Sequence, residues 1–307
     1  MDRVGFIFPG QGAQYVGMGK SFYDSFKTAQ NIFDASEEIL KIPLKDICFQ
    51  GPLEILTSTV NCQVGIFVVS CAVLEVLKEL FPGLKPSMVA GLSLGEYTSL
   101  YASKVLNFES ALKLVHKRAY FMQKASEEFP AGMASVIGLD KDLINEVCKE
   151  FDLEIANINC PGQIAVSGPK EKIIKSTEAF KQKGAKKVVV LNVSGAFHSR
   201  FMESARAKLS QYLEEIEFKV PFCELVSNVS AQPTLDPKII KNNLIEQMTG
   251  VVNWQGCCQF MISQGIELFL EIGPGKVLKG LMRRISPQAK VLSIGELSDV
   301  ESVKEVI

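Results

Sequence analysis

The chain has 307 residues, of which 47% are hydrophobic, and a formal net charge of −1. This length and composition are sufficient for one large domain or for two unequal ones. The near-zero net charge argues against nucleic acid or an anionic membrane surface as the main partner.

The apolar runs are too short to indicate a signal peptide or a membrane span. Val4–Phe8 is a short run, and the most apolar internal run, residues 65–74, is interrupted at Ser70. The eight cysteines form no Cys-x-x-Cys pair and only two histidines are present, so we expect reduced thiols and no zinc site. We therefore expect a cytoplasmic globular protein that uses no metal or redox cofactor.

The first predicted strand, Val4–Phe8, is followed by a glycine-rich loop. A dinucleotide-binding fingerprint that starts at Gly10 needs glycine at position 15, which is Tyr15. A Walker loop that ends at Ser21 needs glycine at position 14, which is Gln14. Both nucleotide-binding motifs are excluded, which leaves either a simple turn or a ligand loop at the C-terminal edge of a strand.

A second apolar run leads into Gly91-Leu-Ser-Leu-Gly95, and a helical pattern starts directly after it. This layout is typical of a nucleophile elbow, in which a strand turns sharply into a helix and exposes the serine, here Ser93. Glycines on both sides let the backbone segments approach closely. The main-chain N–H groups and the helix dipole near Leu94 would stabilise an oxyanion. The alternative is a glycine-rich turn with an incidental serine.

Helical patterns are predicted over residues 33–40 and 66–80, and a third begins after Asn107, a good N-cap. Apolar residues of the third helix form one face, and Arg118 lies at the margin of that face. An arginine in this position usually extends its guanidinium to solvent.

From Met133 onward the pattern changes to short strands that alternate with helices. The predicted strands cover residues 134–139, 153–159, 163–167 and 187–193, and the helices cover 141–151 and a segment that Pro169 opens and Gly184 closes. The order β-α-β-β-α-β is that of a ferredoxin-like unit. We expect such a subdomain at residues 129–195, inserted into a larger domain formed by residues 1–128 and 196–307.

The remaining segments again alternate strand, glycine-rich turn and helix, which indicates a parallel sheet. Strands are predicted at residues 222–226, 268–272 and 291–294, and helices at 236–248 and 276–285. The predicted fold class is therefore α/β, with a large α/β-hydrolase-like domain built on a parallel sheet and a small ferredoxin-like subdomain.

A serine nucleophile needs a base, and the chain offers two histidines. His116 lies in the middle of the helix that follows Asn107. His198 lies just before another predicted helix, with Ser199 as the expected cap. Because a helix N-terminus disfavours imidazolium, we expect His198 to be neutral and to be the base.

An ordered set of motifs resembles the malonyl-CoA:acyl carrier protein transacylases of bacterial fatty acid synthesis. The motifs cover residues 6–12, 91–97, Arg118 with 121–123, 156–163, 195–199 and 271–275. Together they extend over essentially the whole chain. Many members of the family carry histidine directly before the nucleophile, where this chain has Leu92. That position is not the catalytic base in the family, so the departure concerns fine tuning and not the reaction.

The resemblance implies a reaction and the residues that perform it. The malonyl group of malonyl-CoA is transferred to the phosphopantetheine thiol of acyl carrier protein, by a ping-pong mechanism through a malonyl-serine ester. Ser93 is the implied nucleophile and His198 the implied base. Gln11 and Leu94 offer their main-chain N–H groups to the oxyanion.

The resemblance also implies substrate-binding residues. Arg118 pairs with the malonyl carboxylate, which a planar bidentate guanidinium suits. Gln247 helps to orient the histidine, and Phe197 narrows the pocket against α-methyl malonyl groups. Because acyl carrier proteins are acidic, we also expect a basic docking patch, with Lys186, Lys187, Lys279, Arg283 and Arg284 as candidates.

Two alternatives remain. A serine esterase or thioesterase could share the elbow, but it would usually show a clear triad acid and would not need Arg118. A non-catalytic carrier-binding protein would not need Ser93, His198 and Arg118 together.

Overall fold

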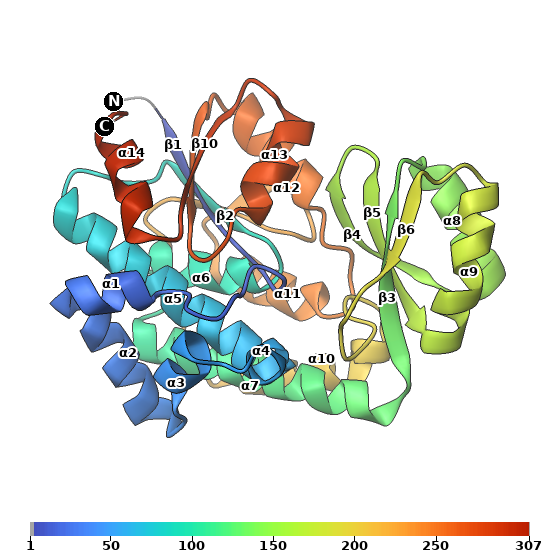
Figure 1. The fold of residues 1–307 in the computed structure, drawn as a ribbon, viewed down its shortest axis with the longest axis horizontal. Helices are drawn as coiled ribbons and strands as arrows, with labels where there is room; N and C mark the ends of the chain where they lie inside the picture. Colours follow the sequence, from blue (N-terminus) through green and yellow to red (C-terminus); the bar gives the residue numbers. More distant parts are fainter. Residues whose placement is uncertain (1–2, 307) are drawn as a thin grey trace.

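Six strands form the sheet of the larger domain in the computed structural model, which describes residues 3–306 (Figure 1). Their order is β10-β9-β1-β2-β7-β8. Their bounds are β1 Val4–Phe8, β2 Met88–Gly91, β7 Glu224–Val226, β8 Pro233–Thr234, β9 Leu268–Ile272 and β10 Lys290–Ile294. All neighbours pair in parallel except β7 and β8. The predicted parallel sheet is confirmed, with a short antiparallel edge strand that the sequence did not indicate.

Helices cover both faces of this sheet. They are α1 Lys20–Ser25, α2 Lys27–Leu40, α3 Leu44–Phe49, α4 Leu53–Thr57, α5 Thr59–Leu80, α6 Leu94–Ala102, α7 Phe108–Glu128, α10 Glu203–Glu214, α11 Pro237–Gln247, α12 Trp254–Ser263, α13 Val277–Ile285 and α14 Glu301–Lys304, with the 3₁₀ turns η1 Arg200–Met202 and η2 Leu297–Val300. Strand β1 alternates between the two cores. Phe6 and Phe8 belong to the cluster that contains α5 and α7, whereas Ile7 packs in the cluster with Trp254 of α12.

Helix α5 is buried in the centre of the larger core. By length and composition it is a helix that could cross a membrane, with a mean hydropathy of 2.0 over its most apolar window. However, 83% of that window is buried inside the protein. A helix that is apolar all round is typical of a protein core as well as of a membrane span, and here the packing identifies it as a core helix. The sequence analysis recognised only its C-terminal part, from residue 66.

The smaller unit contains a four-stranded antiparallel sheet with α8 and α9 on its outer side (Figure 1). Its elements are β3 Ala131–Ile137, α8 Lys141–Phe151, β4 Glu154–Cys160, β5 Gln163–Pro169, α9 Lys170–Gln182 and β6 Lys187–Val190. The β-α-β-β-α-β order and the sheet order β4-β5-β3-β6 are consistent with the expected ferredoxin-like unit. Because this unit has its own apolar cluster, we propose 129–195 as its boundaries.

Hydrogen bonds join the two units beside the edge of the large sheet. The amide of Ile158 on β4 donates to the carbonyl of Val252 at 2.9 Å, and the amide of Val252 donates to Ala156 at 2.9 Å. The hydroxyl of Ser167 on β5 donates to the carbonyl of Phe197 at 2.6 Å. The Ser167 bond ties the small sheet directly to the segment that carries His198.

Two predicted helix starts are wrong in detail. Pro169 is the last residue of β5 and the N-cap of α9, and does not occupy the first helical position. Ser199 precedes the 3₁₀ turn η1, but its hydroxyl donates to the carbonyl of Ala196 and does not cap that turn. At Pro169 the pairing with Ala131 of β3 extends the strand, and after Ser199 the Arg200 amide donates to Glu154 of the small unit, so the local capping pattern does not decide the geometry.

Candidate active site

Ser93 occupies a sharp turn between β2 and α6. Its backbone has φ 50° and ψ −96°, a region that is costly for a residue with a Cβ atom. The turn depends on its two glycines. A Cβ atom at Gly91 would lie 1.9 Å from the carbonyl carbon of Gly95, and one at Gly95 would lie 2.1 Å from the carbonyl oxygen of Phe8. The predicted elbow therefore has the expected backbone geometry, and Phe8 shows that β1 packs directly against it.

Asn228 holds the strained turn in place. Its Oδ1 accepts a hydrogen bond from the Ser93 amide at 2.7 Å, and its Nδ2 donates to the Gly91 carbonyl at 2.7 Å. Sequence analysis did not identify this residue. Its position directly after β7, the strand beside β2, is the signal that could have indicated it.

His198 contacts Ser93 through its Nε2 atom, which lies 2.8 Å from Ser93 Oγ. Its Nδ1 atom lies 2.7 Å from the main-chain carbonyl oxygen of Gln247. A carbonyl oxygen can only accept, so Nδ1 carries the proton and Nε2 is free to accept the Ser93 hydroxyl proton. The third member of the arrangement is therefore a backbone carbonyl in place of the carboxylate found in many serine hydrolases.

Burial and the nearby Arg118 guanidinium lower the pKa of His198 to about 4. The expected neutral histidine is thus supported, but its cause differs from the predicted one. The helix dipole is not the reason, because a 3₁₀ turn starting at Arg200 separates His198 from α10. The other histidine, His116, is partly exposed on α7, and burial and Lys117 lower its pKa.

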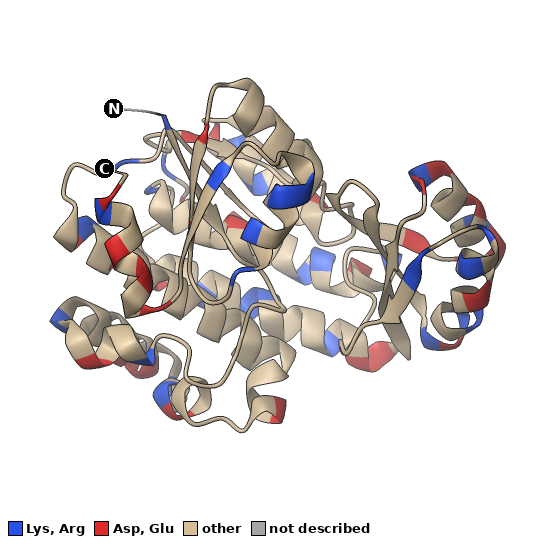
Figure 2. Ribbon diagram, turned by 45° about the horizontal axis from the view of Figure 1, so that its top comes forward, with Lys and Arg blue, Asp and Glu red and all other residues tan. Residues whose placement is uncertain are grey.

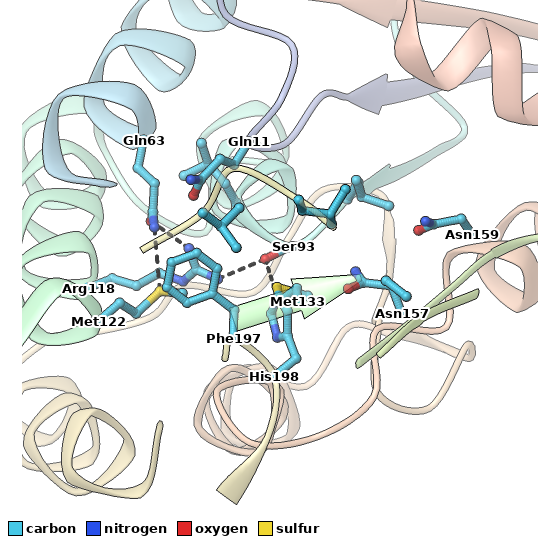
Figure 3. Close-up of a pocket in the computed structure, with 15 residues that line it drawn as sticks. Gln11, Gln63, Ser93, Arg118, Met122, Met133, Asn157, Asn159, Phe197 and His198 are labelled. Atoms are coloured by element: carbon cyan, nitrogen blue, oxygen red, sulfur yellow. Dashed lines mark hydrogen bonds between the residues drawn. The ribbon is translucent and has the colours of Figure 1, made fainter. Parts of the chain in front are cut away.

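Arg118 is 1% exposed, and the expectation that it extends to solvent is wrong. Its Nη2 atom donates to Ser93 Oγ at 2.9 Å, and its Nη1 atom donates to Gln63 Oε1 at 2.5 Å (Figure 3). Nη2 also donates to Gln247 Oε1 at 3.0 Å. The guanidinium also lies 4.8 Å from the centre of the Tyr97 ring. Two amides and an aromatic face therefore replace the water that an arginine at a helix margin would normally seek.

Gln63 was missed by the sequence analysis because it lies within the apolar pattern of α5. It is buried, and its Nε2 atom contacts the sulfur of Met122 at 3.4 Å. A single polar residue inside a continuous apolar helix is the signal that could have indicated a buried partner for a charge.

A cavity of about 150 Å³ lies above Ser93, between the large domain and the small sheet. Figure 3 shows the side chains of Phe197, Met122 and Met133 around Ser93 and Arg118. The predicted site residues that line it are Gln11, Ser93, Leu94, Arg118, Phe197 and His198, and the others include Gln63, Leu92, Asn157, Asn159, Leu191 and Val193. This volume is far below the ~300–1,000 Å³ of sites for drug-sized ligands, so it suits a small acyl group.

The main-chain amides of Gln11 and Leu94 belong to the two loops that meet at Ser93. Within residues 3–306, no main-chain carbonyl accepts a hydrogen bond from either amide. Leu94 is the first residue of α6, where such amides are normally free. Two unengaged donors beside a serine are the arrangement that an oxyanion requires.

Comparison with known proteins agrees with this geometry. Residues 5–298 match the family model described as acyl transferase domain. The malonyl CoA-acyl carrier protein transacylase of Bacillus subtilis strain 168 is 38% identical over 306 residues, which cover 98% of this chain and 96% of that protein.

Solved structures are similar over the same length. The acyl carrier protein S-malonyltransferase of Vibrio cholerae has a TM-score of 0.94 and 32% identity, covering 98% of this chain and 100% of that one. A malonyl-transacylase in complex with its type II PKS acyl-carrier protein has a TM-score of 0.96 and 34% identity, with 99% of each chain covered. The family resemblance inferred from the motifs is confirmed. The chain belongs to the acyl transferase domain family and, within it, to the malonyl CoA-acyl carrier protein transacylases.

Proposed function

We propose that this protein transfers the malonyl group of malonyl-CoA to the phosphopantetheine thiol of acyl carrier protein, supplying fatty acid synthesis in the cytoplasm. The observation that carries the proposal is the buried Arg118 guanidinium 2.9 Å from Ser93 Oγ in a cavity of about 150 Å³. In a malonyl thioester, the carboxylate is only two carbon–carbon bonds from the reacting carbonyl. A cation beside the nucleophile therefore suits this acyl group.

In the first half-reaction, Ser93 Oγ attacks the thioester carbonyl while His198 Nε2 takes the hydroxyl proton. The amides of Gln11 and Leu94 donate to the oxyanion of the tetrahedral intermediate. When the intermediate collapses, the carbon–sulfur bond breaks and His198 returns its proton to the CoA sulfur. The malonyl-Ser93 ester remains, and the carrier thiol attacks it by the same steps in reverse order.

Arg118 selects the substrate through its carboxylate. Its Nη2 atom donates to Ser93 Oγ and so occupies a lone pair of the nucleophile. An arriving malonyl carboxylate would take over this donor as a charge-assisted partner and leave Ser93 bonded to His198 alone. Phe197, beside the base and 5% exposed, limits the space for an α-methyl group.

The competing proposal is a serine thioesterase. The orienting group for His198 is a neutral carbonyl, and the acyl group would fill most of a small cavity of about 150 Å³, which leaves water little room beside the ester. These features favour transfer to a thiol over hydrolysis. If release of free malonate outruns transfer to the carrier thiol, the thioesterase is the correct alternative.

The direct test is intact mass spectrometry after mixing with malonyl-CoA, followed by peptide mapping. We expect one malonyl adduct, located on Ser93, and its loss on addition of the carrier protein. The control is Ser93→Ala, which should carry no adduct. An adduct on one of the eight buried cysteines, or an adduct that persists in Ser93→Ala, would overturn the proposal.

A further inference from the structure

Glu96 is a fully buried acid one helical turn from the nucleophile, and no step of the proposed reaction uses it. Its Oε2 atom accepts hydrogen bonds from Gln247 Nε2 at 2.6 Å and from the Asn228 amide at 3.2 Å. Its Oε1 atom is buried and finds no partner among the residues that the structure describes. An ionised carboxylate with one dry, unpaired oxygen is costly, whereas a protonated one can carry its hydrogen there.

Glu96 determines which way the Gln247 amide points. The Nε2 atom of Gln247 faces three acceptors, Glu96 Oε2 at 2.6 Å, Ser93 O at 3.1 Å and Asn228 Oδ1 at 3.4 Å. The Oε1 atom is thereby turned toward Arg118, whose Nη2 atom donates to it at 3.0 Å. Because a guanidinium can only donate, a flipped amide would set two donors against each other. Glu96 thus acts on Arg118 through Gln247.

We propose that Glu96 is a positioning residue for Arg118 and that it takes up a proton when an acyl group bearing a carboxylate enters the pocket. The inference rests on the proposed function, because it requires the substrate carboxylate to pair with Arg118. The physical reason is charge. Arg118 is the cation that faces Glu96, and a second carboxylate beside one buried cation favours the protonated form of the first.

The other titratable groups around Glu96 do not offer a competing charge. Tyr97 follows it on α6, and burial raises the pKa of that phenol to about 12. Cys257 on α12 also has a raised pKa because it is buried. His198 is neutral above about pH 4. For Glu96 itself, burial raises the pKa to about 7, while Gln247, the Asn228 amide, the Ser227 side chain and Arg118 lower it, so the acid is near half-protonation at neutral pH.

Linkage makes the effect measurable in two ways. If the carboxylate of malonyl-CoA favours the protonated acid, then protonation must favour malonyl-CoA by the same factor. The apparent affinity for malonyl-CoA should fall by about fivefold or more between pH 6 and pH 8.5, within the usual range of such coupling. Acetyl-CoA, which lacks the carboxylate, should show no comparable change.

The first experiment measures malonylation of Ser93 by malonyl-CoA in a rapid-quench assay from pH 6 to pH 8.5, for the wild type and Glu96→Gln. The glutamine can keep its carbonyl oxygen at the Oε2 position but cannot titrate. We expect KM for malonyl-CoA to rise with pH in the wild type and to be flat in Glu96→Gln. Glu271→Gln is the matched control, since Glu271 is also buried but lies away from the pocket, and it should keep the wild-type profile.

The second experiment needs no Glu96 variant. Calorimetric titration of Ser93→Ala with malonyl-CoA near pH 7.5, in two buffers of different ionisation enthalpy, counts the protons taken up on binding. Acetyl-CoA carries the same nucleotide phosphates and provides the baseline. We expect uptake in excess of that baseline. Equal uptake for the two ligands, or a pH profile of KM that is the same in Glu96→Gln, would overturn the inference. Absence of malonyl-Ser93 in the wild type would instead overturn the proposed function.

Discussion

Two strand-to-helix junctions of the large sheet are built alike but differ in how their polar groups are hydrogen-bonded. In both, a buried strand ends in a glycine-containing turn and a helix begins, at β2–α6 around Ser93 and at β9–α13 after Gly273. At β9–α13, the Glu271 carboxylate caps the N-terminus of α13. Its Oε1 accepts from the Leu278 amide at 2.7 Å, and its Oε2 accepts from the Lys279 main-chain amide at 3.0 Å and from the Ser293 hydroxyl at 2.6 Å.

The β2–α6 junction is left open. The amide of Leu94 has no main-chain acceptor among residues 3–306, and three buried polar atoms around Ser93 lack partners in the same part of the chain, namely Glu96 Oε1, Tyr97 Oη and Arg118 Nε. A buried polar group without a partner costs about 1–3 kcal/mol. The comparison indicates that the acid of the β9–α13 junction has hydrogen bonds to both of its oxygens, whereas the groups around the nucleophile keep unpaired polar atoms at a cost in stability.

The largest expected effect is a loss of reaction rate when the base beside the β2–α6 junction is removed. Replacing His198 with alanine removes the base and should lower the rate of Ser93 malonylation by roughly 10²–10⁴. The matched control is His116→Ala, which removes the other histidine. Because His116 does not line the cavity, this variant should keep a rate near that of the wild type. Full activity in His198→Ala together with loss in His116→Ala would reverse the assignment of the base.

Glu96 and His198, which are both buried near Ser93, should change the unfolding free energy with pH in opposite directions. The pKa of Glu96 is raised to about 7, so its contribution to the unfolding free energy falls as pH rises from about 4.5 to 7. The pKa of His198 is lowered to about 4, so its contribution falls as pH drops from about 6.5 to 4.

Between pH 5 and pH 6.5 these slopes nearly cancel in the wild type. Each is worth about 1 kcal/mol per pH unit, from the rule of 1.36 kcal/mol per pKa unit. We expect the slope of unfolding free energy against pH to become more positive in Glu96→Gln and more negative in His198→Gln, as measured by urea titration. Parallel slopes in all three proteins would show that neither group titrates as stated.

Arg118→Ala tests whether the open junction is built for a carboxylate. A charge-assisted pair is worth about 1.5–3 kcal/mol, so kcat/KM for malonyl-CoA should fall at least roughly tenfold. The kcat/KM for acetyl-CoA should fall far less. It should rise if the hydrogen bond from Arg118 to Ser93 Oγ slows the wild-type reaction. Arg118→Lys keeps the charge without the planar fork and should recover only part of the loss. An equal fall for both substrates in Arg118→Ala would make the residue structural.

Glu271→Gln, at the β9–α13 junction, should lower stability and leave the reaction rate nearly unchanged. One of the three donors around Glu271 would face an NH₂ group in the variant, which costs about 1–3 kcal/mol of stability. The malonylation rate of the folded fraction should stay within about twofold of the wild type. The lost hydrogen bond lowers the stability of the fold, and Glu271 does not line the cavity. A large loss of rate with unchanged stability would place Glu271 in the reaction and break the comparison.

The smallest expected effect concerns docking of the carrier. Arg284 is a weaker candidate than the sequence suggested, because its guanidinium donates to Gln163 Oε1 at 3.1 Å and to the Pro161 carbonyl at 3.2 Å on the small subdomain. Figure 2 shows Lys and Arg mixed with Asp and Glu on the outer helices of that subdomain, so no single-sign surface is present on those helices. We therefore expect Arg283 and its neighbour Lys279 on α13 to contribute more.

Charge reversal of Arg283 to Glu should slow transfer to the carrier about three- to tenfold, mainly through the association rate. Transfer to a small neutral thiol should be unaffected. Lys175→Glu on the outer helix α9 is the matched control, and raising salt should weaken only the carrier reaction. Equal salt sensitivity for both acceptors would remove the case for a basic docking patch.

Local patterns in the sequence predicted most of the elements and the sharp turn at Ser93, whereas the reaction was predicted from the family resemblance. The strands β1 and β9 and the helix α8 have the predicted bounds, because periodicity and turn residues act over a few neighbours. Asn107 caps α7 as expected, with its side chain 2.8 Å from the Ser110 amide. The glycines around Ser93 predicted a sharp turn, and the clash of a Cβ atom at Gly91 with the carbonyl carbon of Gly95 is local to that turn.

The polar partners of the site depend on contacts that no local pattern contains. Ser93 meets Asn228 from 135 residues away, and Arg118 meets Gln63 and Gln247 across 55 and 129 residues. The pattern of α7 placed Arg118 at the edge of an apolar face, a position that by itself favoured exposure to solvent. The tertiary structure, which sets β7 beside β2, brings α5 and α7 to one cavity and places Gln247 of α11 against Arg118, decides that its partners are two buried amides and the nucleophile.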